Sequence, residues 1–168
     1  MTLSQTGLTR RLGQTVLAID PGSVRVGVAV SDPTGKIALP VSVITRVGNS
    51  HIKQLEKIAR ERAVDEIVVG LPKTLKGTEG PAADAARSFA DELHKRLGLP
   101  VHLFDERLTT LDAHAALRSA GVKGERQGSV VDKVAATLLL QAFLDARGAA
   151  QARHQTGERP SDPENSSR

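Results

Sequence analysis

The chain of 168 residues contains no cysteine, tryptophan or tyrosine, and its aromatic content is 2%. The absence of cysteine excludes disulfides, thiolate metal sites and cysteine nucleophiles. So few aromatic rings argue against nucleic-acid binding through rows of stacked side chains, as in RRM sheets and many single-strand-binding proteins. Long apolar runs are also missing, since the longest span about five residues and a bilayer requires roughly 20. We therefore expect a soluble cytoplasmic protein with no membrane partner and no signal peptide.

Positive charge is concentrated near the two ends of the chain. The formal net charge is +4 and the isoelectric point about 9.8. Arg10 and Arg11 contribute part of it, and the segment from Arg147 onward is also net positive. Residues 15–146 are consequently close to neutral. A basic chain is typical of nucleic-acid-binding proteins, but here any basic surface on the central part has to be local.

The length and composition predict one domain with two polar extensions. Residues 1–14 are polar without clear periodicity, which indicates a flexible arm. Residues 147–168 contain no large apolar side chain, so we expect a disordered tail. Residues 15–146 form the predicted domain, with enough hydrophobic residues for one core.

Strand and helix patterns alternate within the central part. Strands are predicted at 16–20, 24–30, 36–45, 66–69 and 101–104, and helices at 52–59, 81–97, from 109 and from 129. Pro81 suits a first helical turn and Gly98 a helix end, while the capping sequences at 109–112 and 129–132 suit two further helix starts. A three-stranded meander followed by strand–helix crossovers implies an α/β fold, with one mixed sheet between helices.

Acidic residues follow two of the predicted strands. Asp20 ends the first strand, Asp105 and Glu106 follow the last, and Asp132 lies in the first turn of the final predicted helix. Ligands of open α/β sheets bind at the carboxyl ends of the strands, so these acids could meet at one edge. Carboxylates brought together repel one another unless a cation neutralises them. Such oxygen ligands suit Mg²⁺ or Mn²⁺, which support phosphodiester cleavage.

Each acid also has a structural interpretation. Asp20 precedes Pro-Gly, a common turn sequence, and Asp132 could interact with a helix dipole. Asp105 and Glu106 could be solvated loop charges paired with Arg107. The joint placement of the acids, more than any single one, favours a metal site.

The loop "GLPKTLKGTEGP" at 70–81 is a second candidate site. Lys73, Lys76 and the backbone amides before a helix start could hold a phosphate, although the loop lacks the P-loop order of residues. The alternative is an ordinary surface loop. The five histidines lack metal-ligand spacing, and Ser23 and Ser31 have no nearby base that would make them nucleophiles.

Four sequence blocks together resemble the bacterial YqgF/RuvX family. They are "AIDPGSVRVGVAVSD", "VVGLPKTLKGTEGPAADAARSFADEL", "PVHLFDERLTT" and "SVVDKVAATLLLQAFLD", and the resemblance extends over residues 16–145. The first block alone is less specific, because actin-like ATPases share its acid and glycine pattern. A departure occurs at Thr74, where the family more often has Asn. The resemblance implies a ribonuclease H-like fold with sheet order 3-2-1-4-5, an antiparallel second strand and a divalent-metal nuclease site.

The resemblance also implies roles for individual residues. The catalytic and metal-binding set would be Asp20, Glu106 and Asp132, with Asp105 as the alternative to Glu106, and the cofactor Mg²⁺ or Mn²⁺. Nucleic-acid contacts are expected from four basic residues, namely Arg25, Lys73, Lys76 and Arg107.

The activity implied by the resemblance is processing of the 5′ end of precursor 16S ribosomal RNA. The expected partners are precursor rRNA or branched DNA and the ribosome or its precursor particles, with the protein as a monomer or homodimer. The main alternative is Holliday-junction resolution, which requires two active sites and hence a dimer. An actin-like ATP-binding module would need more residues than 15–146. A non-catalytic RNA-binding assembly protein would not require the three acids.

Overall fold

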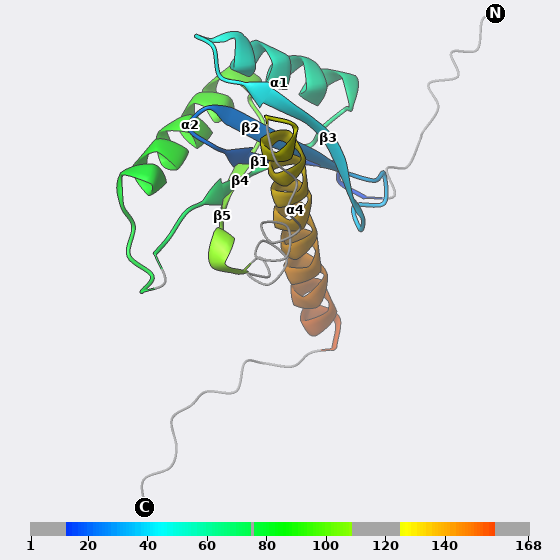
Figure 1. Cartoon of the computed structure of the whole chain (residues 1–168). Helices are drawn as coiled ribbons and strands as arrows, with labels where there is room; N and C mark the ends of the chain where they lie inside the picture. The colour runs from blue at the N-terminus through cyan, green and yellow to red at the C-terminus, as the bar shows by residue number, and fades with distance from the viewer. Residues whose placement is uncertain (1–12, 75, 109–124, 157–168) are drawn as a thin grey trace, which may run out of the picture.

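The structure, a computed structural model, describes residues 13–74, 76–108 and 125–156. Five strands form one sheet in the order β3-β2-β1-β4-β5 (Figure 1). The strands are β1 Val16–Pro21, β2 Arg25–Ser31, β3 Ala38–Thr45, β4 Glu66–Leu71 and β5 Val101–Asp105. The helices are α1 Ser50–Glu61, α2 Pro81–Leu97 and α4 Glu125–Thr156, with a 3₁₀ turn, η1, at Glu106–Leu108. β2 is antiparallel to β1 and β3, whereas β1, β4 and β5 are parallel, which confirms the predicted order.

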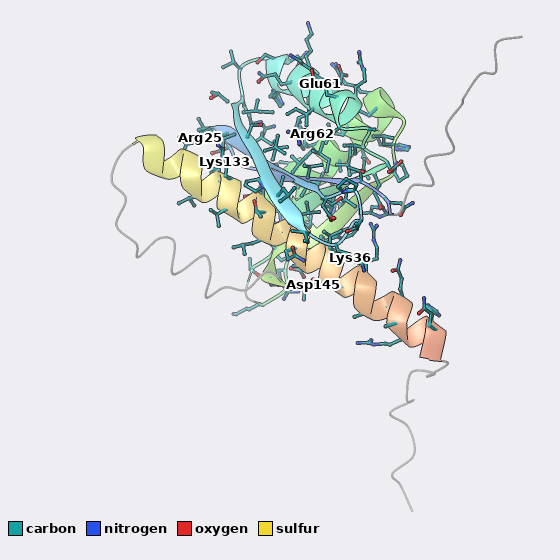
Figure 2. The ribbon with its side chains drawn as sticks, turned by 90° about the vertical axis from the view of Figure 1, so that its right-hand side faces the viewer. Arg25, Lys36, Glu61, Arg62, Lys133 and Asp145 are labelled. Carbon is teal, nitrogen blue, oxygen red and sulfur yellow. The ribbon has the colours of Figure 1, made fainter. Side chains whose placement is uncertain are left out.

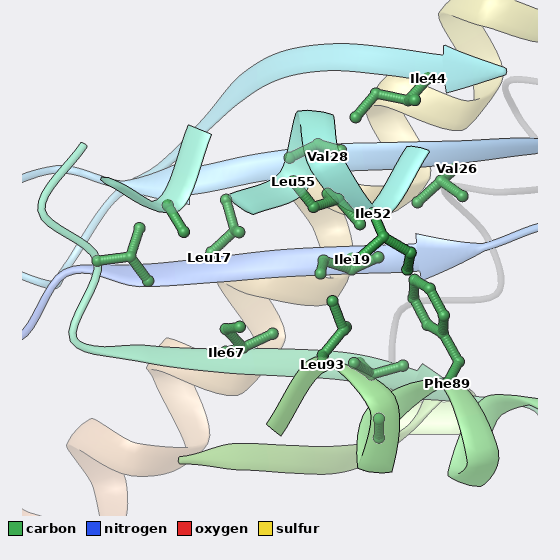
Figure 3. Close-up of a cluster of buried hydrophobic side chains, with 14 of the residues drawn as sticks. Leu17, Ile19, Val26, Val28, Ile44, Ile52, Leu55, Ile67, Phe89 and Leu93 are labelled. Carbon is green, nitrogen blue, oxygen red and sulfur yellow. The ribbon is translucent and has the colours of Figure 1, made fainter. Parts of the chain in front are cut away.

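Helices cover both faces of the sheet because alternate strand residues are apolar on each side. On β1, Leu17 and Ile19 face α1 and α2, whereas Val16 and Ala18 face α4. All four are fully buried. Figure 3 shows the first of these clusters, in which side chains of α1 and α2 pack on β1, β2 and β4. The second cluster lies beneath α4, which crosses the opposite face.

Proline and glycine end or interrupt elements where the sequence predicts it. Pro81 occupies the first turn of α2, and Gly98 ends that helix with a φ of 65°. Pro40 lies on the edge strand β3, opposite an irregularity of register at Val28 and Ala29. An edge position tolerates a residue without an N–H, so Pro40 does not break the sheet.

Two boundary predictions for the last helix are wrong. α4 begins at Glu125, so Ser129 lies inside the helix and does not cap it. The helix also continues to Thr156, so residues 147–156 are not a disordered tail. This stretch is rich in alanine, which has the highest helix propensity, and such a sequence extends a helix without apolar side chains. The predicted helix start at 109–112, the arm at 1–12 and the tail beyond 156 lie outside the described residues.

A buried charge cluster fixes the second half of α4 to the sheet. Glu66 at the start of β4 is 6% exposed. Its carboxylate lies 2.5 Å from the Arg147 guanidinium and 2.8 Å from His102 Nε2. Phe143 contacts both partners of Glu66. The Arg147 Cζ lies 4.8 Å from the centre of its ring, and the centres of the Phe143 and His102 rings are 5.6 Å apart. Arg147 therefore belongs to the folded domain, one residue beyond the predicted boundary.

His51, His94 and Ser31 have contacts that are consistent with structural roles. His51 is buried and stacks on Phe89 with ring centres 6.0 Å apart, and His94 Nδ1 contacts the Leu99 carbonyl. Ser31 is buried and its hydroxyl accepts a hydrogen bond from the Val16 N–H. Within the described ranges, no helix combines the length and hydropathy needed to cross a membrane.

Candidate active site

Asp20 lies near the carboxyl end of β1 between two glycines on neighbouring strands. Gly27 of β2 is its direct partner in the ladder, and Gly70 of β4 follows the last residue that pairs with β1. Asp20 shares the sheet face of Ala18, which is the face that α4 covers. The missing side chains of the two glycines leave space on both sides of Asp20, and each space is filled by part of another predicted site residue.

Asp132 is brought close by Gly27. A Cβ on Gly27 would lie 2.2 Å from the Asp132 carbonyl oxygen, so the α4 backbone rests directly on β2 there. The Asp132 carboxylate accepts a hydrogen bond from Arg25 Nε at 2.8 Å. Figure 2 shows Arg25 next to Lys133, the residue after Asp132 on α4. Arg25 therefore forms an ion pair with the carboxylate of Asp132.

Glu106 fills the space above Gly70. A Cβ on Gly70 would lie 2.6 Å from Glu106 Oε1. Burial raises the pKa of Glu106 to about 7, with further contributions from the charge and a hydrogen bond of Asp20 and from the charge of Asp105. Asp20 and Glu106 thus form a close carboxyl pair, in which the second negative charge is disfavoured.

Asp105 points to a different set of partners. Its carboxylate accepts hydrogen bonds from the Arg107 side chain at 2.6 and 3.1 Å and from the Arg107 backbone N–H at 3.0 Å. Lys73 Nζ lies 3.7 Å away. These contacts, led by the Arg107 hydrogen bond, lower the pKa of Asp105 to about 2. Of the two adjacent acids, the structure brings Glu106, and not Asp105, to Asp20.

Ion pairs connect the loop at 72–80 with α2 and with Asp105. Glu79 accepts hydrogen bonds from Arg87 of α2 at 2.7 and 3.1 Å and lies 3.6 Å from Lys73. These pairs lower the pKa of Glu79, mainly through the Arg87 hydrogen bond. The side chain of Thr74 also closes the loop through a 2.6 Å contact with the Thr78 hydroxyl.

The four basic residues expected at a nucleic acid differ in their surroundings. Arg25, Lys73 and Arg107 are each in ion pairs. Lys76 is exposed, and no ion pair involves it in the part of the chain that the structure describes. The sequence prediction missed the partners Glu79 and Arg87, since only the folded loop brings them together. A glycine inside a predicted strand is a recognised sign of close approach and could have indicated Gly27, whereas Gly70 fell in the predicted loop.

The carboxyl pair fits a divalent cation by its chemistry. Without a cation, the repulsion between the two carboxylates disfavours ionisation of both. Mg²⁺ or Mn²⁺ would favour the ionised form of both, because these ions prefer carboxylate oxygens as ligands. Among the described residues, no group of three or more acidic or histidine side chains is arranged to hold a metal. Asp20 and Glu106 would supply the first ligands, whereas the Asp132 carboxylate lies with Arg25.

Residues 14–146 match the model of a family described as RuvX, Holliday junction resolvase. The chain belongs to this family. A relative from Mycobacterium sp. (strain KMS) is 46% identical over 149 residues, covering 87% of this chain and 85% of its own. One from Pelotomaculum thermopropionicum is 41% identical over 151 residues, covering 89% of this chain and 97% of its own. Both relatives are named as proposed pre-16S rRNA nucleases.

The fold also resembles a solved structure. T. thermophilus RuvC in complex with a Holliday junction substrate superposes with a TM-score of 0.51 at 16% identity, covering 81% of this chain and 97% of RuvC. At this identity the similarity concerns the fold. It confirms the ribonuclease H-like architecture expected for the RuvX family.

The raised pKa of Glu106 predicts that the metal-free protein loses stability as the pH rises. Between the ordinary value of 4.5 and about 7, folded Glu106 keeps a proton that the unfolded chain has released. The free energy of unfolding should therefore fall by about 2 kcal/mol across this window for a half-buried carboxyl group. Urea unfolding in EDTA at pH 5 and pH 8 measures it.

Glu106→Gln provides the control for this pH dependence. The difference between the wild-type and variant profiles isolates Glu106 from other titrating groups. Equal slopes in the two proteins would contradict the carboxyl pair.

Alanine should have different effects at the two glycines. Gly27→Ala should destabilise the fold by about 3 kcal/mol, because the new methyl group meets the rigid α4 backbone. Gly70→Ala meets a movable side chain, so it should cost less than about 1 kcal/mol but displace Glu106 and reduce activity. Thermal unfolding and cleavage rates of both variants test this. Equal loss of stability would show that Glu106 is held as rigidly as the helix.

Proposed function

We propose that this RuvX-family protein is a metal-dependent nuclease that processes the 5′ end of precursor 16S ribosomal RNA. The observation that supports it most is the carboxyl pair of Asp20 and Glu106 at the carboxyl ends of the parallel strands. The names of the curated relatives favour precursor rRNA as the substrate. Such a substrate implies the ribosome or its precursor particles as partners and the cytoplasm as the location.

Asp20 and Glu106 would hold Mg²⁺ or Mn²⁺, with Asp132 completing the site when its carboxylate is released from Arg25. A cation held there would supply a nucleophilic water at neutral pH and would neutralise charge on the phosphate. Glu106 has to lose its proton before it can bind the cation, so metal binding should release a proton below pH 7. Arg25 would then be available to a phosphate oxygen.

The basic residues around the acids suit the backbone of a nucleic acid. Lys73 and Arg107 lie on the segments next to Glu106, and Lys76 lies on the same loop as Lys73. Arginine and lysine side chains contact phosphates without reading the sequence, so these positions would orient the strand. Specificity for one RNA would come from its folded shape or from other contacts.

A second candidate function is resolution of Holliday junctions, which the description of the family model favours. The same carboxylates would serve it, because both reactions hydrolyse a phosphodiester bond. Resolution needs two sites acting across a symmetric junction, and hence a homodimer. A protein that is monomeric at micromolar concentration would argue against this function.

Cleavage of two labelled substrates separates the candidates. One is precursor 16S RNA with its 5′ extension, and the other is a synthetic four-way DNA junction. Each is incubated with Mg²⁺, Mn²⁺ or EDTA. Metal-dependent cutting of the RNA supports rRNA processing, symmetric cutting of the junction supports resolution, and inactivity on both contradicts a nuclease function.

A further inference from the structure

Asp105 is the acid at the carboxyl end of β5 that does not join the carboxyl pair. Its side chain is 15% exposed, and it contacts two cations from two different segments. Arg107 comes from η1, the turn that also carries Glu106. Lys73 comes from the loop after β4. Asp105 therefore connects the loop at 72–80 with the turn that places Glu106 at Asp20.

Arg107 has more contacts than a single surface ion pair would provide. Asp105 accepts hydrogen bonds from the backbone N–H and the side chain of Arg107, so it constrains both ends of that residue. A Cβ on Gly77 would lie 3.1 Å from Arg107 Nη1, which places the guanidinium against the loop. Gly77 has a φ of 80°, a conformation that favours glycine and brings the loop backbone close.

The second cation is held in the same way. Lys73 Nζ lies between two carboxylates, 3.7 Å from Asp105 and 3.6 Å from Glu79. Its side chain is 23% exposed, whereas an unrestrained lysine at a surface extends into solvent. Without Asp105, the positive charges of Lys73 and Arg107 would repel each other across the space it occupies.

We propose that Asp105 is a positioning residue, which holds Arg107 and Lys73 as a paired phosphate-binding site beside the acids. Arg107 presents a planar fork and Lys73 a point charge, a combination suited to adjacent oxygens of a phosphodiester backbone. This role rests on the proposed nuclease function. It assigns Asp105 neither metal binding nor a part in the chemical step.

Asp105→Asn tests the proposal, with Asp91→Asn as a control. Both changes remove one negative charge, and Asp91 is exposed on α2. With the substrate that the wild-type protein cleaves, we expect Asp105→Asn to raise KM about tenfold and leave kcat within about twofold. This pattern is expected when an interaction that is equally strong in the ground state and the transition state is lost. Calorimetric titration with Mn²⁺ alone should give an affinity within about threefold of wild type, because no ligand is lost. Asp91→Asn should leave all three quantities unchanged.

Other outcomes overturn the role in distinct ways. A tenfold or greater loss of Mn²⁺ affinity would make Asp105 a metal ligand. An unchanged or lower KM would show that Asp105 only neutralises Lys73 and Arg107. In that case its replacement would leave their positive charges free to attract the polyanionic substrate. A loss of kcat alone would place it in the chemical step. A wild-type protein that cleaves neither RNA nor junction would overturn the proposed function together with this role.

A mutant cycle shows whether Asp105 acts through its two cations. Arg107→Ala combined with Lys73→Ala should raise KM, and adding Asp105→Asn to that pair should change KM by less than about twofold more. Residues that act as one unit give such non-additive effects, whereas independent contacts multiply. Multiplying effects would contradict positioning through Arg107 and Lys73.

Discussion

Replacing Asp20 by Asn should reduce nucleic-acid cleavage by about a thousandfold or more and at the same time stabilise the metal-free protein. The amide keeps the size of the side chain but removes one of the two charges that face each other. A cation then loses a charged ligand. Glu106, whose pKa is raised first by burial, loses the further contribution that the charge of Asp20 makes to that rise. We expect a gain of about 1 kcal/mol in the free energy of unfolding in EDTA at pH 8.

The opposite signs of these two effects make the experiment decisive. An acid that only formed the turn before Pro21 and Gly22 would lose stability when replaced and leave turnover intact. Asp91→Asn again controls for the change in net charge. Cleavage kinetics and urea unfolding of the same preparations provide both readouts, and unchanged cleavage by folded Asp20→Asn would contradict the proposed site.

Arg147→Ala should destabilise the protein by about 3 kcal/mol. The substitution removes the guanidinium from buried Glu66 and leaves only the His102 contact, and an uncompensated buried carboxylate is costly. It also removes the cation from the ring of Phe143, whose contacts join α4 to the sheet. Thermal and urea unfolding measure the change.

Lys57→Ala provides a matched control, because it also removes a cation that a helix contributes to an ion pair. Lys57 and Glu61 are 73% and 60% exposed and 3.8 Å apart, so this pair should contribute less than about 0.5 kcal/mol. Similar losses in the two variants would show that the Glu66 cluster contributes no more than a surface pair.

The pattern of the sequence predicted most elements because each had a strong local cause. Alternating valines indicated β2, and Pro81 and Gly98 bounded α2 correctly. The order of the strands depends on long-range pairing, so it came from the family resemblance rather than from periodicity. The extension of α4 was missed because low hydrophobicity was interpreted as disorder, although alanine alone favours helix.

The site was less predictable than the fold. Asp105 and Glu106 are adjacent in the sequence, and the pattern could not decide which of them faces Asp20. That choice depends on the η1 turn and on the space above Gly70. Likewise, no local pattern could show that Arg25 pairs with Asp132, because 107 positions separate them.

The placement of Asp132 on α4 has a consequence for biosynthesis. All five strands precede α4 in the chain, so their apolar residues beneath that helix stay exposed until α4 has been synthesised. A domain of this kind completes folding only when its last packed element has left the ribosome. Asp132 arrives with that element, so we expect a nascent chain arrested before α4 to lack nuclease activity. Formation of the proposed site is thereby coupled to completion of the fold.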